Sequence, residues 1–248
     1  MKLSSIRWLF IASVVGAGIT GVVSSNVGCG DSGGTADAGG STGTGGGGGA
    51  VAPRYSNTFD TDLQSWTLSD YVDATYFNWG ATTNPDSGVG LDGGVAPTLA
   101  WSSSTGDPNP GSLRVTVTFT GFRQYIDPQV LLSPPQDFSG THKTVKARIR
   151  LVSGTFPSGG VQFHVSSGTT APNAYVYVSS QFINSTSLTP GNWISISLVT
   201  DAVTPADGRI FDPTQIVQIG VQFTTGDPGA SGTPTFGEAV FEIDTVQA

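Results

Sequence analysis

Side chains that could recognise a ligand stand at alternate positions of three short segments. In 160–165 (GVQFHV), 174–179 (AYVYVS) and 215–224 (QIVQIGVQFT), polar or aromatic residues alternate with aliphatic ones. Alternate side chains of a strand point to the same side, so each set would form one surface. Tyrosine rings can stack on the C–H patches of a sugar, and amides can hydrogen-bond with its hydroxyls. The pattern therefore predicts a saccharide-binding surface made of Gln162, His164, Tyr175, Tyr177, Gln218 and Gln222.

A second group of aromatic residues lies in the segment 70–111, which is rich in Gly, Asp, Asn and Pro. Long loops without regular structure are often functional, so Tyr76 and Trp79 are predicted to contact the ligand from this loop. The alternative for the loop is that its rings plug one end of a β-sandwich. The alternative for the three strands is a solvated face in which tyrosine is simply a good strand former.

Catalytic groups are sparse. The chain has two histidines, His142 and His164, so a metal site with several histidines is nearly excluded and a serine triad would need one of these two. Glu238 and Glu242 are the only glutamates, and four residues apart on a strand they would point the same way. A glycosidase does need two carboxylates, but no aromatic cleft is evident around Glu238. We therefore expect no enzyme, and the alternative is a glycoside hydrolase or lyase.

The elements that would position these residues are strands. Alternation with a period of two recurs along the chain, and strong helix formers are scarce beside Thr, Val, Ser and Gly. Repeated amphipathic strands with turns between them favour an all-β fold, an antiparallel β-sandwich or jelly roll. Further strands are expected in 112–120, 144–152, 193–199 and 239–246, with turns at Asp107-Pro108, Asp127-Pro128, Asp212-Pro213 and Asp227-Pro228.

The charge of the chain excludes one class of partner. The formal net charge is −8 and the pI is about 4.4. Binding to a phosphate backbone requires a basic face. We therefore expect no nucleic-acid partner, and we expect the domain to be a monomer.

The N-terminal residues predict export. Lys2 and Arg7 precede an apolar run over 8–19, and small residues follow the run. This order is typical of a secretory signal. Cys29, the only cysteine, follows Gly28 in an arrangement that resembles a bacterial lipoprotein signal. We expect a signal peptide over 1–28 and a lipid on Cys29 that anchors the protein to the outer membrane or cell surface. The alternatives are a secreted protein with an incidental cysteine, or a leader retained as a membrane anchor.

A flexible tether follows the cysteine. Residues 30–50 (GDSGGTADAGGSTGTGGGGGA) contain nothing that can pack. A glycine-rich coil of about 20 residues spans roughly 25 Å, enough to hold a domain away from a surface. We therefore expect a linker over 29–53 and one jelly-roll domain over 54–248, which contains no cysteine and so no disulfide.

Several short motifs follow one another in this domain. They are NTFD (57–60), LQSW (63–66), GSLRV (111–115), PGNW (190–193), FDP (211–213) with IVQIGV (216–221), and FEIDTV (241–246). Their order resembles the galactose-binding-like β-jelly rolls, which include many non-catalytic carbohydrate-binding modules, over about residues 55–248. The resemblance implies a polysaccharide or oligosaccharide ligand, bound on a concave sheet face or at loop tips.

The resemblance also implies a structural calcium ion where the first and last strands meet. The matching acidic positions are Asp60 and Asp244, and oxygen ligands suit Ca²⁺. The alternative is that both are ordinary strand-end carboxylates. We therefore predict a non-catalytic carbohydrate-binding module-like domain on an exported lipoprotein. The alternative is a structural or adhesive envelope lipoprotein that binds no sugar.

Overall fold

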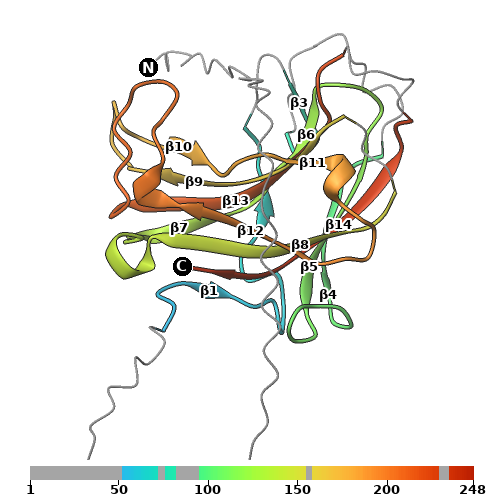
Figure 1. Cartoon of the computed structure of the whole chain (residues 1–248), viewed down its shortest axis with the longest axis horizontal. Helices are drawn as coiled ribbons and strands as arrows, with labels where there is room; N and C mark the ends of the chain where they lie inside the picture. The colour runs from blue at the N-terminus through green and yellow to red at the C-terminus, as the bar shows by residue number, and fades with distance from the viewer. Residues whose placement is uncertain (1–51, 72–75, 82–94, 155–157, 229–234) are drawn as a thin grey trace, which may run out of the picture. The chain divides into compact units, whose positions relative to one another are not determined.

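The computed structural model describes residues 52–71, 76–81, 95–154, 158–228 and 235–248, which belong to one compact unit. Strands predominate in these ranges (Figure 1). The helices among them are 3₁₀ turns of three residues, η1 (Gly140–His142), η2 (Ser185–Ser187) and η3 (Thr200–Ala202). No helix within these ranges has the length and apolarity needed to cross a membrane. The predicted signal peptide, Cys29 and most of the tether lie outside the described residues.

The first sheet has six strands. Five follow the spatial order β12-β8-β14-β5-β4, and a short strand, β1, also pairs with β14. Every pairing in this sheet is antiparallel. The strands are β1 (Ser56–Asn57), β4 (Thr98–Ser102), β5 (Ser112–Thr118), β8 (Thr144–Gly154), β12 (Ile194–Val199) and β14 (Glu238–Gln247).

The second sheet has eight strands. Its central path is β10-β9-β13-β6-β3, while β11 pairs with β9 and β7 lies between β13 and β2. The pairings are antiparallel except for β3 with β6. The strands are β2 (Thr67–Leu68), β3 (Phe77–Asn78), β6 (Gln124–Ile126), β7 (Pro128–Gln136), β9 (Gly160–Ser167), β10 (Val176–Ser179), β11 (Ile183–Asn184) and β13 (Ile216–Thr224).

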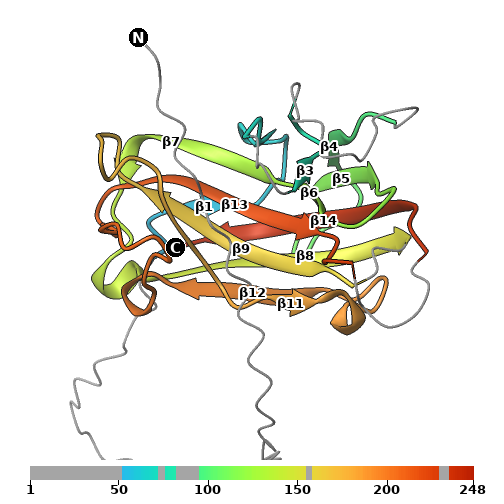
Figure 2. The same ribbon diagram turned by 90° about the horizontal axis from the view of Figure 1, so that it is seen from above.

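The core lies between the two sheets, whose strands overlap in the view of Figure 2. Alternate aliphatic residues of each long strand are buried there, as the period of two predicts. Phe223 of the second sheet stacks on Phe241 of the first, with ring centroids 4.0 Å apart. The prediction of an all-β sandwich of antiparallel sheets is therefore confirmed.

Two local predictions are wrong. Strict alternation along 215–224 would place Val217 on the core side with Ile219, but Ile216 packs in the core instead, because a β-bulge at this point of β13 shifts the alternation by one residue. Asp127-Pro128 is not a turn. β6 and β7 pair with β13 in one continuous register, with Phe223 opposite Ile126 and Gly220 opposite Gln129, so the dipeptide lies within the ladder.

Candidate functional site

The outer face of the second sheet, the side turned away from the core, gathers most of the predicted strand residues. On β9 the core residues alternate with Gln162 and His164, and on β13 they alternate with Gln218 and Gln222. Gln162 lies directly opposite Gln222 in the ladder. Tyr177 reaches the same face from β10. The strand register therefore brings five of the six predicted residues onto one surface.

Three of these residues form a hydrogen-bonded row across β10, β9 and β13. Gln162 Nε2 donates to the Tyr177 hydroxyl oxygen at 2.8 Å and to Gln222 Oε1 at 2.9 Å. All three side chains are half-buried, so each keeps surface toward solvent. A row of this kind holds amide and phenol groups in fixed orientations, which lowers the entropy lost when a ligand binds.

His164 forms the floor beneath this row. Its side chain is 1% exposed, and Nε2 lies 2.8 Å from Asp127 Oδ1. The imidazole stacks on the Tyr177 ring at 5.0 Å between centroids and 28° between planes. His164 is therefore too buried to contact a ligand by itself and instead supports Tyr177. Its Nδ1 is buried and has no hydrogen-bond partner among the described residues.

Gly220 makes room for this arrangement. It lies opposite His164 in the ladder, and a Cβ at this position would come within 2.2 Å of His164 Nε2 and 3.1 Å of Asp127 Oδ1. The absence of a side chain on β13 lets the imidazole cross the strand and reach the carboxylate. Burial, and then the charge of Asp127, raise the pKa of the Tyr177 hydroxyl. The phenol therefore stays neutral at physiological pH.

Two residues of β7 belong to the same face and were missed by the sequence analysis. Gln129 Oε1 accepts a hydrogen bond from Gln218 Nε2, and Leu131, which is 57% exposed, lies opposite Gln218. The residues of the segment 124–132 (QYIDPQVLL) could have indicated a strand, but its Asp-Pro dipeptide predicts a turn. Leu131 places an exposed apolar side chain beside amides, the combination that a sugar ring requires.

Tyr175 does not share the face with Tyr177. It precedes β10, its backbone has φ of 50°, and its N–H donates to the Gly168 carbonyl at 3.0 Å. The left-handed backbone at Tyr175 breaks the alternation on which its placement was based. Tyr175 is an exposed residue of the loop between β9 and β10.

The loop aromatics separate. Trp79 packs edge-on against Phe77 with centroids 5.0 Å apart, and its Nε1 donates to Gln124 Oε1 at 3.3 Å. Trp79 is buried in the core cluster, so its predicted role as a ligand contact is wrong. Its position agrees with the alternative, in which rings of this loop fill the end of the β-sandwich. Tyr76 is half-buried immediately before β3.

The outer face of the first sheet carries a buried ion cluster. Glu242 is fully buried, and its carboxylate accepts from Arg150 at 2.6–2.7 Å, from Arg114 at 3.3 Å and from the Thr105 hydroxyl at 2.9 Å. The Arg150 guanidinium also lies 4.8 Å from the ring centroid of Trp193. Glu242 is thus committed to structural contacts, which disfavours the hydrolase alternative.

The predicted calcium ligands lie close enough to interact. Burial first, with a smaller contribution from Asp60, raises the pKa of Asp244 to about 6. The two Asp244 oxygens accept backbone N–H groups of Asp107 at 2.5 Å and Thr245 at 2.6 Å. The described residues contain no group of three His, Cys, Asp or Glu side chains suited to a metal. Two carboxylates supply fewer than the six to eight oxygens that Ca²⁺ takes, so backbone carbonyls or water would have to complete this site.

Comparisons with known proteins complete the description. No protein-family model and no curated protein matches the chain. The solved structures that it resembles include carbohydrate-binding modules of the β-sandwich type. A family 28 module specific for non-crystalline cellulose matches with a TM-score of 0.46 and 16% identity, over 80% of this chain and 93% of that one. The family 30 module of a Clostridium thermocellum cellulosomal cellulase matches at 0.45 and 10%, over 78% and 97%.

A module of promiscuous specificity from the β-sandwich superfamily matches at a TM-score of 0.44 and 19% identity. That match covers 74% of this chain and 56% of the other. Scores and identities of this size describe a partial likeness and say nothing about the ligand of this chain.

Proposed function

We propose that the domain is a non-catalytic carbohydrate-binding module whose ligand lies across the outer face of the second sheet. The observation that supports it is the row in which Gln162 joins Tyr177 to Gln222, with Gln218 and Leu131 on the same face. Amides both donate and accept hydrogen bonds, as sugar hydroxyls do, and the exposed leucine offers apolar contact. Three neighbouring strands carry the row, so an extended glycan can contact all of them.

The charge of the face favours a neutral glycan. Among the described residues named on this face, Asp127 alone is acidic, and its carboxylate is buried against His164. A ligand carrying carboxylates or sulfates would gain no counter-charge here and would lie near that carboxylate. The same composition supports a binding role over hydrolysis, because a glycosidase requires two carboxylates flanking the bond.

Affinity electrophoresis in gels containing glucans, xylans, mannans or pectins tests the proposal. We expect at least one neutral polysaccharide to retard the domain. Gln162→Ala removes an amide that can hydrogen-bond with the ligand and that also orients Tyr177 and Gln222, and a loss of about 1.4 kcal/mol in binding would raise the dissociation constant roughly tenfold. Ser197→Ala, an exposed residue of β12 on the other sheet, is the control and should bind as the unchanged protein does. Absence of retardation on the whole panel would leave the structural or adhesive alternative.

The anchoring of the domain is a separate proposal. We infer from the leader and the position of Cys29 that the protein is exported and held at the outer membrane or cell surface by a lipid on that cysteine. Labelling of cells with a clickable fatty acid should mark the protein and should fail for Cys29→Ala. An unlabelled protein that fractionates with the medium would instead indicate secretion. Light scattering should report a monomer.

We also propose that Asp60 and Asp244 contribute to a structural calcium site, as the resemblance implies. The support is their electrostatic interaction and the burial of Asp244, since a cation would offset the cost of a charge held there. Isothermal titration of the chelator-treated protein with CaCl₂ tests this directly. Binding of calcium by the unchanged protein but not by Asp244→Asn is the expected result.

A further inference from the structure

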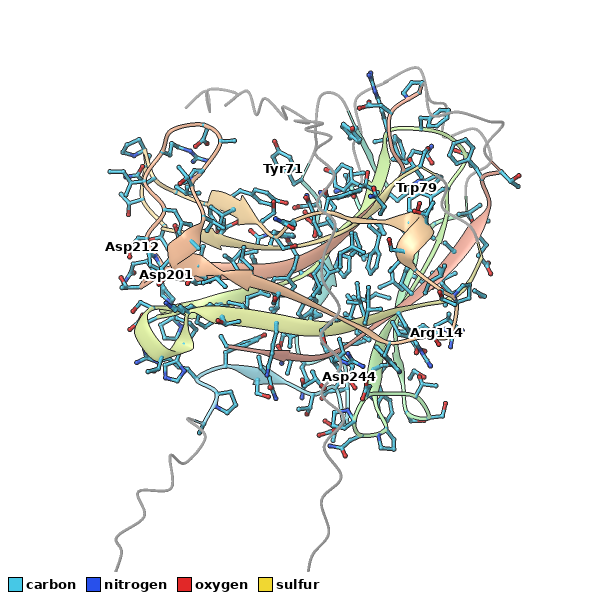
Figure 3. All side chains as sticks on the ribbon, viewed as in Figure 1. Tyr71, Trp79, Arg114, Asp201, Asp212 and Asp244 are labelled. Carbon is cyan, nitrogen blue, oxygen red and sulfur yellow. The ribbon has the colours of Figure 1, made fainter. Side chains whose placement is uncertain are left out.

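A pocket lies between two loops at one end of the second sheet. One loop, 168–175, joins β9 to β10, and the other, 208–215, leads into β13. The pocket has a volume of about 280 Å³, and its lining includes Ser167, Thr169, Asn173, Ile210, Asp212 and Gln215. Figure 3 shows Asp212 at the end of the domain away from Trp79. The lining of the pocket shares no residue with the row on the outer face.

Hydrogen bonds between the two loops hold this pocket in shape. The Gly168 N–H donates to the Gln215 carbonyl at 2.9 Å, and Arg209 Nη1 donates to the Ala174 carbonyl at 2.8 Å. Gly168 has φ of 82°, which closes the turn that leaves β9. Because both loops are fixed, a ligand that enters pays little for ordering them.

The polar side chains of the pocket keep unused hydrogen-bonding capacity. Asn173 Oδ1 accepts the Ile210 N–H at 3.3 Å, while the two hydrogens of its Nδ2 meet no acceptor among the described residues. Asp212 Oδ1 accepts the N–H and hydroxyl of Thr214 at 2.9 and 2.7 Å, whereas Oδ2 accepts nothing from the described part of the chain. The pocket thus offers a donor pair and a charged acceptor.

We propose that this pocket is a second saccharide site, which takes one neutral sugar ring with vicinal hydroxyl groups. A hydroxyl both donates and accepts, so adjacent hydroxyls can give a hydrogen bond to Asp212 Oδ2 and receive one from Asn173 Nδ2. Ile210, which is 69% exposed, supplies the apolar surface for the C–H side of the ring. The volume lies below the range of about 300–1,000 Å³ for pockets of drug-sized ligands, which suits one ring and not a chain.

The charge of the pocket sets its ligand class. Asp212 is the single charged residue that lines it within the described part of the chain. Arg209, which holds the neighbouring loop, is paired with Asp207 at 2.6 Å and is not a free cation. A uronic acid would therefore bring a second carboxylate beside Asp212 and bind more weakly than the corresponding neutral sugar.

Backbone-amide NMR of the isotope-labelled full chain tests the proposal. The probes are the methyl β-glycosides of glucose, xylose, galactose and mannose at millimolar concentration, with sodium glucuronate as the acidic comparison. At least one neutral glycoside should shift the amides of 168–173 and 210–215 in a saturable way. Glucuronate should shift them less.

Variants separate this site from the outer face. Asn173→Ala removes the amide that donates to a sugar hydroxyl, and Asp212→Asn removes the charged oxygen that accepts from one. Each variant should therefore raise the dissociation constant of the bound glycoside about tenfold. Asn192→Ala, an exposed asparagine ahead of β12, is the matched control and should bind normally. Tyr177→Phe alters only the outer face and should leave these shifts unchanged, so the two sites can fail independently.

Three results would overturn the proposal. The first is that no neutral glycoside shifts the two loops. The second is that glucuronate shifts them as strongly as the best neutral glycoside. The third is that Asn173→Ala and Asp212→Asn, with folded spectra, bind as the unchanged protein does.

Discussion

Replacement of Gly220 by alanine tests how the outer face of the second sheet is assembled. The new methyl carbon would lie 2.2 Å from His164 Nε2 and 2.5 Å from Cε1, well inside contact distance. The imidazole is 1% exposed and is held between Asp127, 2.8 Å from Nε2, and the Tyr177 ring. Either the strands separate or His164 leaves Asp127, and Tyr177 then loses the ring on which it stacks.

The expected cost follows from these contacts. Overpacking a well-packed site costs about 1–3 kcal/mol. Loss of a hydrogen bond to a charged group adds about 1.5–3 kcal/mol where His164 is displaced from Asp127. The two costs do not simply add, because moving His164 away from Asp127 relieves the overpacking. We therefore expect Gly220→Ala to lower the free energy of unfolding by about 2–4 kcal/mol. Binding of a polysaccharide should weaken about tenfold, since Tyr177 and Gln162 lose their fixed orientation.

Urea unfolding of a double-mutant cycle is the assay. Gly220→Ala, His164→Ala and the combined variant are compared with the unchanged protein, and affinity electrophoresis reports binding. If the imidazole is the obstacle, Gly220→Ala should cost less than about 1 kcal/mol in the His164→Ala background. An equal cost in both backgrounds would refute the proposed role of Gly220, because the clash would then lie elsewhere.

Four further predictions rest on contacts described above. Leu131→Ala should weaken polysaccharide binding several-fold in affinity electrophoresis without changing the urea midpoint, because this side chain is exposed; a lower midpoint would contradict the reasoning. Arg150→Ala should lower the free energy of unfolding by about 3–5 kcal/mol, since it leaves Glu242 buried with only its weaker contacts. Because the pKa of Asp244 is raised to about 6, stability should fall by up to about 3 kcal/mol as pH rises from about 4 through 6, and Asp244→Asn should lack this step. At neutral pH, CaCl₂ should raise the melting temperature and EDTA should reverse it; no change would argue against calcium.

The sequence predicts the strands and also predicts which of their side chains lie together on one face of a sheet. Alternation is a local property, because the pleat places every second side chain on the same side. For this reason the buried partners of β8, β9 and β12 and the outward position of Gln162, Gln218 and Gln222 agree with the pattern. Where the backbone departs from regular geometry, the same rule fails, as at Tyr175 with its positive φ and at the bulge beside Ile216.

The remaining features depend on contacts between distant parts of the chain. Trp79 is buried because β3 pairs with β6, and Asp127 meets His164 because β6 and β9 flank β13 across Gly220. The pocket at Asp212 exists because two loops about forty residues apart are tied together. The sequence by itself therefore determined the fold class and the side of the sheet that faces solvent. Tertiary structure alone decided which of those residues support one another and where a second ligand can enter, since strand order and loop pairing are not local properties.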